Sequence, residues 1–536
     1  MKKAINRGRI YPMKPSKNIS RPESVSLKVF LGVLLSAIFC LLLVVPFAAA
    51  QMNITGFWIF KTPPGDGNFR EMFLDLKQDG ENVTGKVMFG PRREIPISDG
   101  TLRNGTLHFT VTFGRPPQTR EVTYDGTVED DKISLTSAFP GRAPLKGTAE
   151  RGDPKVMLPP ARIPPPALHD VSDNGLARTP PMGWNSWNKF AGKVTDADVR
   201  GMADAMVSSG MKDAGYVYIN IDDTWEGPRD ANSNITSNTK FPDMKALADY
   251  VHSKGLKIGI YTSPGPKTCA GYEGSYGHEQ QDANTYAAWG FDYLKYDWCS
   301  ADQIYKNEDM QAVYQKMGDA LLKTGRPIVF SLCQYGEEDV WKWGAKVGGN
   351  LWRTTGDIND TWKRMSEIGF KQFDIASYIR VGHWNDPDML EIGNGGMTND
   401  EYKTHMSLWS LLAAPLLAGN DLRTMSGETK EILMNHEVIA IDQDPDGRPA
   451  KRISDPAATA VVVARPLHDG SMAVGLFNRD DQPQAVTVKW SDIDLSGKTL
   501  RVRDLWKHAD VATSEDGYTA TVPAHGVVLL KVTSGQ

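Results

Sequence analysis

The sequence predicts an α/β protein built around a (β/α)8 barrel of the TIM type, with a small antiparallel β domain before the barrel and an antiparallel β-sandwich after it. The 536 residues are too many for one ordinary domain but suit a barrel with two small modules. Over residues 174–445 short apolar stretches alternate with helical ones, as in βα units around a parallel sheet. On both sides of this region apolar and polar residues alternate in short runs, which indicates antiparallel strands.

Residues 1–50 have the pattern of an export signal. Basic residues are scattered up to Lys28, an uninterrupted apolar run starts at Val29, and three alanines that end at Ala50 provide a cleavage site. We therefore expect a periplasmic or secreted protein. The apolar run is also long enough to span a bilayer, so an uncleaved membrane anchor is the alternative.

The two flanking regions are expected to be β domains. Residues 51–153 contain alternating runs at 55–60, 72–76, 83–89, 106–112, 121–128 and 132–136, which predict a small barrel or sandwich. This region contains no cluster of catalytic residue types. A spacer is the simpler interpretation, and a carbohydrate-binding role is the alternative. Residues 154–173 are rich in proline and form a semi-rigid linker. Residues 446–536 return to β alternation and predict the C-terminal sandwich.

The central region contains eight candidate strands for the parallel barrel. In such barrels the catalytic groups lie on loops at the C-terminal ends of the strands, so the last residues of each strand are the first candidates for function. The expected strands cover residues 182–187, 217–222, 257–262, 292–297, 327–333, 351–355, 382–385 and 415–418.

Charge and cysteine content narrow the possible partners and the compartment. The net charge of −5 is a small acidic excess, and it produces no field that would attract a polyphosphate. Nucleic acid is therefore not an expected partner. Removal of the signal would leave Cys269, Cys299 and Cys333, which allow one bridge and one spare thiol. An oxidising compartment is compatible with a Cys269–Cys299 bridge, although the sequence alone leaves the pairing open.

The predicted strand ends carry a ring of carboxylates and aromatic residues. Glycosidic cleavage needs one carboxylate at the anomeric carbon and a second carboxyl group that protonates the leaving oxygen. This chemistry requires no metal or other cofactor. For any single aspartate, capping of the following helix is the alternative role. The ring comprises Trp187, Asp222, Asp223, Tyr261, Lys295, Asp297, Gln334, Arg353, Asp357, Asp386 and Asp388.

Several long motifs, in order along residues 175–444, resemble glycoside hydrolase family 27, whose best-known members are α-galactosidases. They include "GLARTPPMGWNSWNKF", "YINIDDTW", "FDYLKYDWC", "LWRTTGDINDTW", "HWNDPDMLEIGNGGMT" and "LWSLLAAPLLAGNDL". The resemblance implies that Asp297 is the nucleophile and Asp357 the acid/base of a two-step displacement with retention. The implied substrate is a terminal α-galactoside.

The resemblance also assigns substrate contacts. Asp222 and Asp223 match paired acids that accept hydrogen bonds from the 4- and 6-hydroxyls of galactose. Arg353 matches a residue that binds the 2-hydroxyl, Trp187 would form a wall for the apolar sugar face, and Tyr261 would lie beside the nucleophile.

The remaining implied roles concern charge and loop structure. Lys295 matches a base near the nucleophile, and we expect it to keep Asp297 ionised, while a less polar setting keeps Asp357 protonated. Cys269 and Cys299 match a bridge between the loop after the third strand and the end of the fourth strand.

The chain departs from the family pattern at three positions. Thr224 stands where many members have cysteine, so a second bridge is absent. Gln334 stands where α-galactosidases have the glutamate that meets the 2-position group, and Trp298 follows the nucleophile in place of the frequent asparagine or glycine. The alternatives are therefore an α-N-acetylgalactosaminidase, a β-L-arabinopyranosidase or a noncatalytic sugar-binding protein. Retention of Asp222 and Asp223 argues for a 6-hydroxyl and against arabinose.

Four further residues are expected to have structural roles. Asp388 and Asp386 should support the site at a strand end rather than bind calcium. His383 should be a core histidine with satisfied hydrogen bonds, and Cys333 an inert buried thiol.

Overall fold

A computed structural model describes residues 53–62, 71–89, 94–115, 118–138 and 144–534. The expected signal or anchor at residues 1–50, with Cys40, lies outside this range. Within it, no helix combines the length and the apolar character that a bilayer crossing requires.

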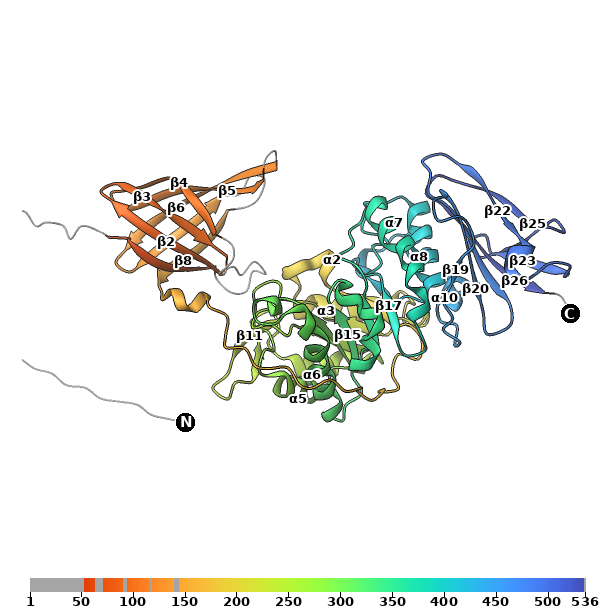
Figure 1. Cartoon of the computed structure of the whole chain (residues 1–536), viewed down its shortest axis with the longest axis horizontal. Coiled ribbons are helices and arrows are strands. Elements are labelled where there is room, and N and C mark those ends of the chain that lie inside the picture. The colour runs from red at the N-terminus through yellow and green to blue at the C-terminus, as the bar shows by residue number, and fades with distance from the viewer. Residues whose placement is uncertain (1–52, 63–70, 90–93, 116–117, 139–143, 535–536) are drawn as a thin grey trace, which may run out of the picture. The chain divides into compact units, whose positions relative to one another are not determined.

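The N-terminal domain is a closed barrel of eight antiparallel strands, red to orange in Figure 1. Pairing between the first and the last strand closes it, so the barrel leaves no free edge. The strands are β1 (Gly56–Lys61), β2 (Glu71–Asp79), β3 (Asn82–Met88), β4 (Glu94–Arg103), β5 (Thr106–Arg115), β6 (Gln118–Glu129), β7 (Lys132–Ala138) and β8 (Leu145–Arg151).

Sequence analysis missed two strands of this domain. β4 contains Pro96, Asp99 and Gly100, all poor strand formers, and its pairing with β5 is irregular between Ser98 and Thr101. β8 has the sequence LKGTAER, in which Ala149 is the buried residue, so no apolar alternation is visible. Both strands are formed because the closed barrel supplies partners on each side.

The linker lies along the helices of the central domain after a short 3-10 turn at Pro154–Met157. Arg162 pairs with Asp309 at 2.9 Å, and the amide of Ile163 donates to the Tyr276 hydroxyl at 2.7 Å. These contacts fix a proline-rich segment that has no strand or helix after Met157.

The central domain contains the parallel barrel that the sequence predicts. Its strand order is β17-β16-β15-β14-β13-β10-β9-β18, and a bridge between Leu390 and Ala418 joins its two ends. All eight expected strands are present, and seven of them are shorter than predicted. The strands expected at 182–187, 217–222 and 351–355 lose their last residues, which leave the ladder near the cleft, whereas the other four begin one or two residues later than predicted. They are β9 (Met182–Asn185), β10 (Tyr218–Asn220), β13 (Lys257–Thr262), β14 (Tyr293–Asp297), β15 (Val329–Cys333), β16 (Leu351–Arg353), β17 (Trp384–Asp386) and β18 (Leu416–Ala418).

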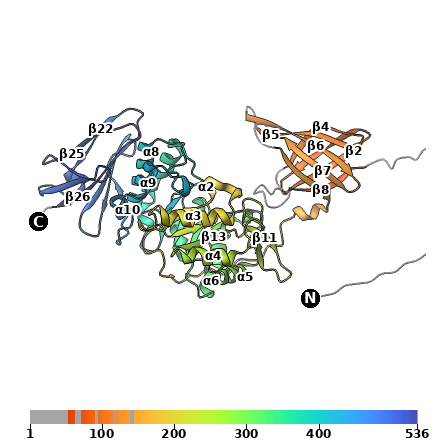
Figure 2. The same ribbon diagram turned by 180° about the vertical axis from the view of Figure 1, so that it is seen from behind.

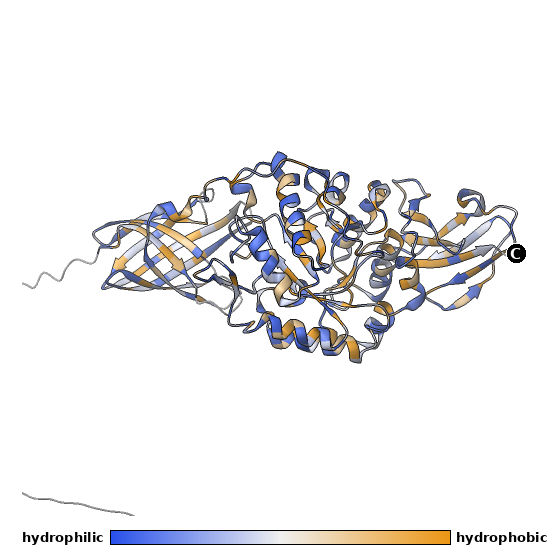
Figure 3. Cartoon of the chain, turned by 90° about the horizontal axis from the view of Figure 1, so that it is seen from below, coloured by the Kyte–Doolittle hydropathy of each residue, from blue (hydrophilic) through white to orange (hydrophobic). Residues whose placement is uncertain are grey.

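Amphipathic helices cover this barrel, as Figure 2 shows from the reverse side. Along them the colour in Figure 3 alternates between polar and apolar residues, as expected for helices with one buried face. The main helices are α3 (Asp196–Ser208), α4 (Met244–Ser253), α5 (Glu279–Trp289), α6 (Met310–Lys323), α7 (Trp362–Lys371), α8 (Asn399–Leu412), α9 (Gly427–Leu433) and α10 (His436–Asp442). A hairpin of β11 (Glu226–Arg229) and β12 (Ile235–Ser237) follows β10.

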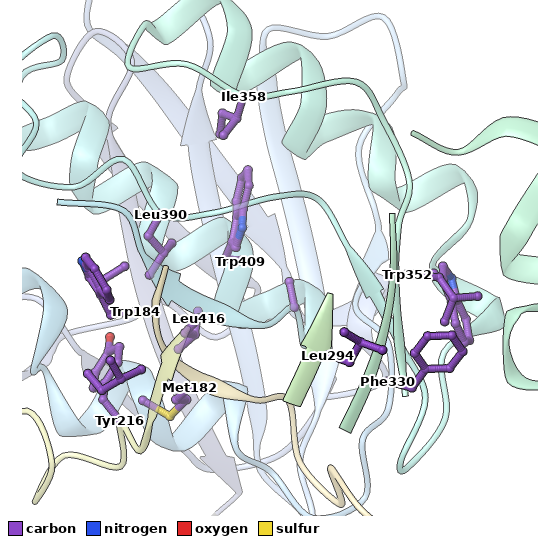
Figure 4. Close-up of a cluster of buried hydrophobic side chains, with 14 of the residues drawn as sticks. Met182, Trp184, Tyr216, Leu294, Phe330, Trp352, Ile358, Leu390, Trp409 and Leu416 are labelled. Atoms are coloured by element: carbon purple, nitrogen blue, oxygen red, sulfur yellow. The ribbon is translucent and has the colours of Figure 1, made fainter. Parts of the chain in front are cut away.

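Large aromatic side chains fill the core between the barrel and its helices (Figure 4). The indole N–H groups of Trp184, Trp352 and Trp409 each donate at 2.8 Å, to Asn420 O, Asn385 Oδ1 and Asp388 O respectively. Because each buried indole has a partner, these residues add apolar area without an unsatisfied donor.

The C-terminal domain is the expected β-sandwich. A six-stranded sheet of β19 (Lys451–Arg452), β20 (Ala460–Pro466), β21 (Met472–Asn478), β26 (Val527–Ser534), β23 (Leu500–Asp504) and β24 (Ala509–Val511) accompanies the pair β22 (Gln484–Lys489) and β25 (Gly517–Val522). The outer face of the large sheet belongs to the same apolar cluster as the catalytic barrel. Phe477 packs edge-on against Phe370 at 5.5 Å, and the buried Arg465 donates to Ser410 O at 2.7 Å.

Candidate active site

A cleft of about 840 Å³ lies at the C-terminal ends of the parallel strands. Every predicted catalytic and substrate-binding residue lines it except Gln334. The predicted residues in its wall are Trp187, Asp222, Asp223, Tyr261, Lys295, Asp297, Arg353 and Asp357. Because these residues come from five different strand ends, the closed barrel is what brings them together.

Asp297 is the last residue of β14 and is 5% exposed. Its Oδ1 accepts hydrogen bonds from the Tyr335 hydroxyl at 2.6 Å and from the Trp298 amide at 2.9 Å. Its Oδ2 accepts a longer bond, 3.3 Å, from the Tyr261 hydroxyl. Burial raises the pKa of this carboxyl, whereas the charge of Lys295 and the Tyr335 hydrogen bond act to lower that pKa. The expected influence of Lys295 is therefore present, but burial outweighs it.

Lys295 makes its direct ion pair with Asp222. The Nζ to Oδ2 distance is 2.8 Å, and Asn185 donates to the same oxygen at 2.8 Å. The neighbouring Asp223 accepts from the amides of Thr224 and Ala270 at 2.7 and 2.8 Å. Burial raises the pKa of Asp223 to about 7. The two acids therefore differ in their partners. Asp222 is paired with a cation, whereas Asp223 accepts hydrogen bonds from neutral backbone amides.

The setting of Asp357 differs from the expectation. Its side chain is 71% exposed, and Arg353 donates to its Oδ1 at 3.0 Å. The expected less polar environment is therefore wrong for the free protein. The reason is position, because Asp357 lies in a loop four residues beyond the end of β16, outside the buried strand ends. Arg353 also pairs with the buried Asp388 at 2.9 Å.

Asp388 has the supporting role that the sequence suggested, and it also lines the cleft. Its Oδ2 accepts the amide of Ile358 at 2.8 Å, which anchors the loop that carries Asp357. Asp386 accepts the Asp388 amide at 2.8 Å, and burial raises the pKa of Asp386 to about 6. These contacts order the loop around the exposed carboxyl.

Gln334 does not reach the cleft. It follows β15 with 0% exposure, and neither of its amide atoms has a hydrogen-bond partner among the described residues. Tyr335 lines the cleft in its place. The chain turns here, with φ of 62° at Tyr335 and 84° at Gly336. Because of this turn the Tyr335 side chain faces the cleft and the Gln334 side chain does not, the reverse of what a regular strand was expected to give. The prediction for Gln334 is corrected on this geometry.

A second part of the cleft wall escaped sequence analysis. It consists of polar side chains after β9 and β17, in which Glu391 accepts hydrogen bonds from Asn188 and Asn394. Burial raises the pKa of Glu391 to about 7. Asp360 lines the same part of the cleft and accepts the Tyr402 hydroxyl at 2.9 and 3.0 Å. The sequence feature that could have predicted this part of the cleft is the segment "EIGNGG" after β17, which is polar and glycine-rich where a barrel loop is expected.

The cysteines are placed as the family resemblance implied. Cys269 and Cys299 form a disulfide that joins the loop after β13 to the residues after β14, and Cys333 is free and buried. Within the described residues, Cys269, Asp297 and Cys299 are the group whose ligand atoms lie close enough to hold a metal, but its two sulfur atoms are bonded to each other.

Hydrogen bonds hold Thr224, which stands where many family members have cysteine. Lys240 Nζ donates to Gly192 O at 2.6 Å and to Thr224 Oγ1 at 2.9 Å. They tie the chain after β9 to the chain after β10. His383 is a buried core histidine whose Nδ1 lies 2.7 Å from Gly349 O, as expected.

The Lys295–Asp222 pair gives a stability prediction. Lys295→Met leaves Asp222 as a buried charge without its cation, so we expect the free energy of unfolding to fall by about 3–5 kcal/mol at neutral pH. Lys295→Met combined with Asp222→Asn should be more stable than Lys295→Met alone. Urea unfolding of the four proteins measures the coupling. The exposed pair Lys245–Asp249 is the matched control, with a coupling below about 1 kcal/mol. Additive effects at the buried pair would contradict this account.

Comparison with known proteins agrees with the geometry. The family model described as alpha galactosidase A matches residues 179–444, and the model of the alpha galactosidase C-terminal beta sandwich domain matches residues 457–532. An alpha-galactosidase of Cyamopsis tetragonoloba is 49% identical over 368 residues, which cover 68% of this chain and 88% of that protein.

Solved structures give the same result. The crystal structure of alpha-galactosidase I from Mortierella vinacea has a TM-score of 0.65 and 40% identity, with coverage of 67% of this chain and 98% of that one. The Saccharomyces cerevisiae alpha-galactosidase with raffinose has a TM-score of 0.64 and 29% identity, with coverage of 68% and 100%. With the two carboxylates at the barrel mouth, these matches show that the chain belongs to glycoside hydrolase family 27.

Proposed function

We propose that this protein is a retaining glycoside hydrolase that releases terminal α-linked D-galactose from oligo- or polysaccharides. The main support is the shared cleft, in which a buried carboxylate, Asp297, and a solvent-exposed one, Asp357, accompany the paired acids Asp222 and Asp223. A double displacement needs two carboxyl groups facing one bound sugar, and the cleft supplies both.

In the first step Asp297 attacks the anomeric carbon, and the glycosidic C–O bond breaks as Asp357 gives its proton to the departing oxygen. In the second step Asp357 takes a proton from water, the water oxygen bonds to the same carbon, and the bond to Asp297 breaks. Two inversions give net retention. Because Asp357 is exposed, it can exchange protons with solvent between turnovers.

Two features favour galactose over the sugars of the alternative family activities. Asp222 and Asp223 together offer acceptors for the 4- and 6-hydroxyls, and a pentopyranose lacks the second of these groups. An acetamido group at C2 would need space beside Arg353, where the Tyr335 ring lies 5.8 Å from the guanidinium carbon. The retained pair of catalytic carboxylates argues against a noncatalytic sugar-binding protein.

The leaving group would occupy the polar part of the cleft. Asp360, Glu391 and Asn394 lie in the same wall as Asp357 and offer hydrogen-bonding groups to a further sugar. This extension supports an oligosaccharide as the substrate rather than a small aglycone alone.

Initial rates on a panel of aryl glycosides test this substrate assignment. We expect kcat/KM for the α-D-galactoside to exceed the values for the α-N-acetylgalactosaminide and the β-L-arabinopyranoside by at least about 100-fold, since a missing or misplaced polar contact in a buried site is costly. A higher value for either analogue would reject galactose as the substrate. Inactivity on the whole panel would support the noncatalytic alternative.

Azide rescue tests the two catalytic roles separately. Asp297→Gly should lose turnover by about 10⁴-fold or more, and azide should restore it on an activated aryl α-galactoside and give the β-galactosyl azide. Asp357→Gly should give the α-galactosyl azide instead, because the glycosyl-enzyme still forms. Product stereochemistry is read by NMR. If the two products were exchanged between the variants, the roles of the two aspartates would be reversed.

We also propose that the protein is exported. The support is the basic and apolar pattern of residues 1–50 together with the bridge between Cys269 and Cys299, which is stable in oxidising compartments. Mass spectrometry of the N-terminus should find Gln51 as the first residue. A chain that begins at its original N-terminus and fractionates with membranes would indicate the anchor instead, and an intact cytoplasmic chain would contradict export.

A further inference from the structure

Tyr335 enters the cleft from an unusual backbone position. Its φ of 62° is disfavoured for an aromatic residue, and the next residue, Gly336, has a φ of 84°. A Cβ atom at Gly336 would lie 2.1 Å from Thr354 O, so no other residue fits there without a backbone shift. The neighbouring strand end therefore holds the turn that directs Tyr335 toward the nucleophile.

The two carboxylate oxygens of Asp297 have unequal hydrogen-bond partners. Oδ1 accepts both the Tyr335 hydroxyl at 2.6 Å and the Trp298 amide at 2.9 Å. Among the described residues, Oδ2 accepts a single, longer bond of 3.3 Å, from the Tyr261 hydroxyl. Oδ1 is thus held by two short bonds, and Oδ2 keeps the lone pairs that a nucleophile requires.

We propose that Tyr335 is a positioning residue for the nucleophile, whose hydroxyl fixes Oδ1 of Asp297 and leaves Oδ2 to attack the anomeric carbon. The inference rests on the proposed function. It adds a donor that the family resemblance did not assign and that replaces Gln334 at this strand end. The Tyr335 ring also lies 5.8 Å from the Arg353 guanidinium carbon, which limits its movement.

The charged groups around Asp297 set the sign of the expected effect. Burial and Asp222 raise the pKa of Asp297, while Lys295, the Tyr335 hydrogen bond and Arg353 lower it. The Tyr261 hydroxyl contacts Oδ2 from β13. A hydrogen bond to a carboxylate stabilises its charged form, so removal of the Tyr335 hydroxyl raises the pKa of Asp297. The acidic limb of activity must then move to higher pH.

The test compares pH profiles of kcat/KM for wild type and Tyr335→Phe on 2,4-dinitrophenyl α-galactoside. This leaving group needs no proton from Asp357, so the acidic limb reports the ionisation of Asp297. We expect the limb to move up by about one pH unit and the plateau to fall about 10-fold. Tyr250→Phe is the matched control, because it removes a hydroxyl that donates to a carboxylate, Asp204, at 2.8 Å on the helical surface. This control should leave the profile unchanged.

A second variant keeps the ring and the fold. Fluorotyrosine at position 335 is a stronger donor, so the acidic limb should move to lower pH. If thermal unfolding shows that Tyr335→Phe is misfolded, the fluorotyrosine variant decides. If the wild type is active and a folded variant leaves the acidic limb of the pH profile unchanged, the role of Tyr335 is overturned and the proposed function stands. If the wild type is inactive on every glycoside, the proposed function itself is overturned.

Discussion

Burial of several carboxyl groups at one barrel mouth is the constraint on which the site depends. The buried aspartates 222, 223, 297, 386 and 388 accompany two cationic side chains, Lys295 and Arg353. Negative groups in a low-dielectric cleft repel one another, so they must be paired, hydrogen-bonded or protonated. Ion pairs occur at Asp222 and Asp388 and a tyrosine donor at Asp297, while burial raises the pKa of Asp223 to about 7 and that of Asp386 to about 6, so that their neutral forms persist to higher pH.

The sequence was sufficient for the barrel and for most of the site because both depend on local patterns. Each parallel strand is a short apolar run, and the polar residues at its end necessarily meet at one edge. Gln334 was assigned to the cleft and Tyr335 was overlooked because their directions depend on a left-handed backbone turn that composition does not reveal. The exposure of Asp357 depends on the path of a loop beyond its strand, which no strand pattern encodes.

The flanking β domains show how tertiary context overrides local propensity. β8 carries almost no apolar residues, yet β1 and β7 bind it from both sides and close the barrel. In the catalytic domain, the three-way contact of Lys240, Thr224 and Gly192 joins two loops where many family members have a covalent bridge. Sequence analysis could identify the missing cysteine but not the distant lysine that bonds to Thr224.

Two of the three domains share one apolar core, which has a consequence for the cooperativity of unfolding. Phe477 and Leu529 of the sandwich belong to the same apolar cluster as the catalytic barrel, whereas the cluster of the N-terminal barrel contains only residues of that domain among those described. Domains with a common core lose their structure together, and a domain with its own core loses it independently. We therefore expect the catalytic barrel and the sandwich to behave as one thermodynamic unit, and the N-terminal barrel to be a module whose loss leaves the fold of the catalytic site unchanged.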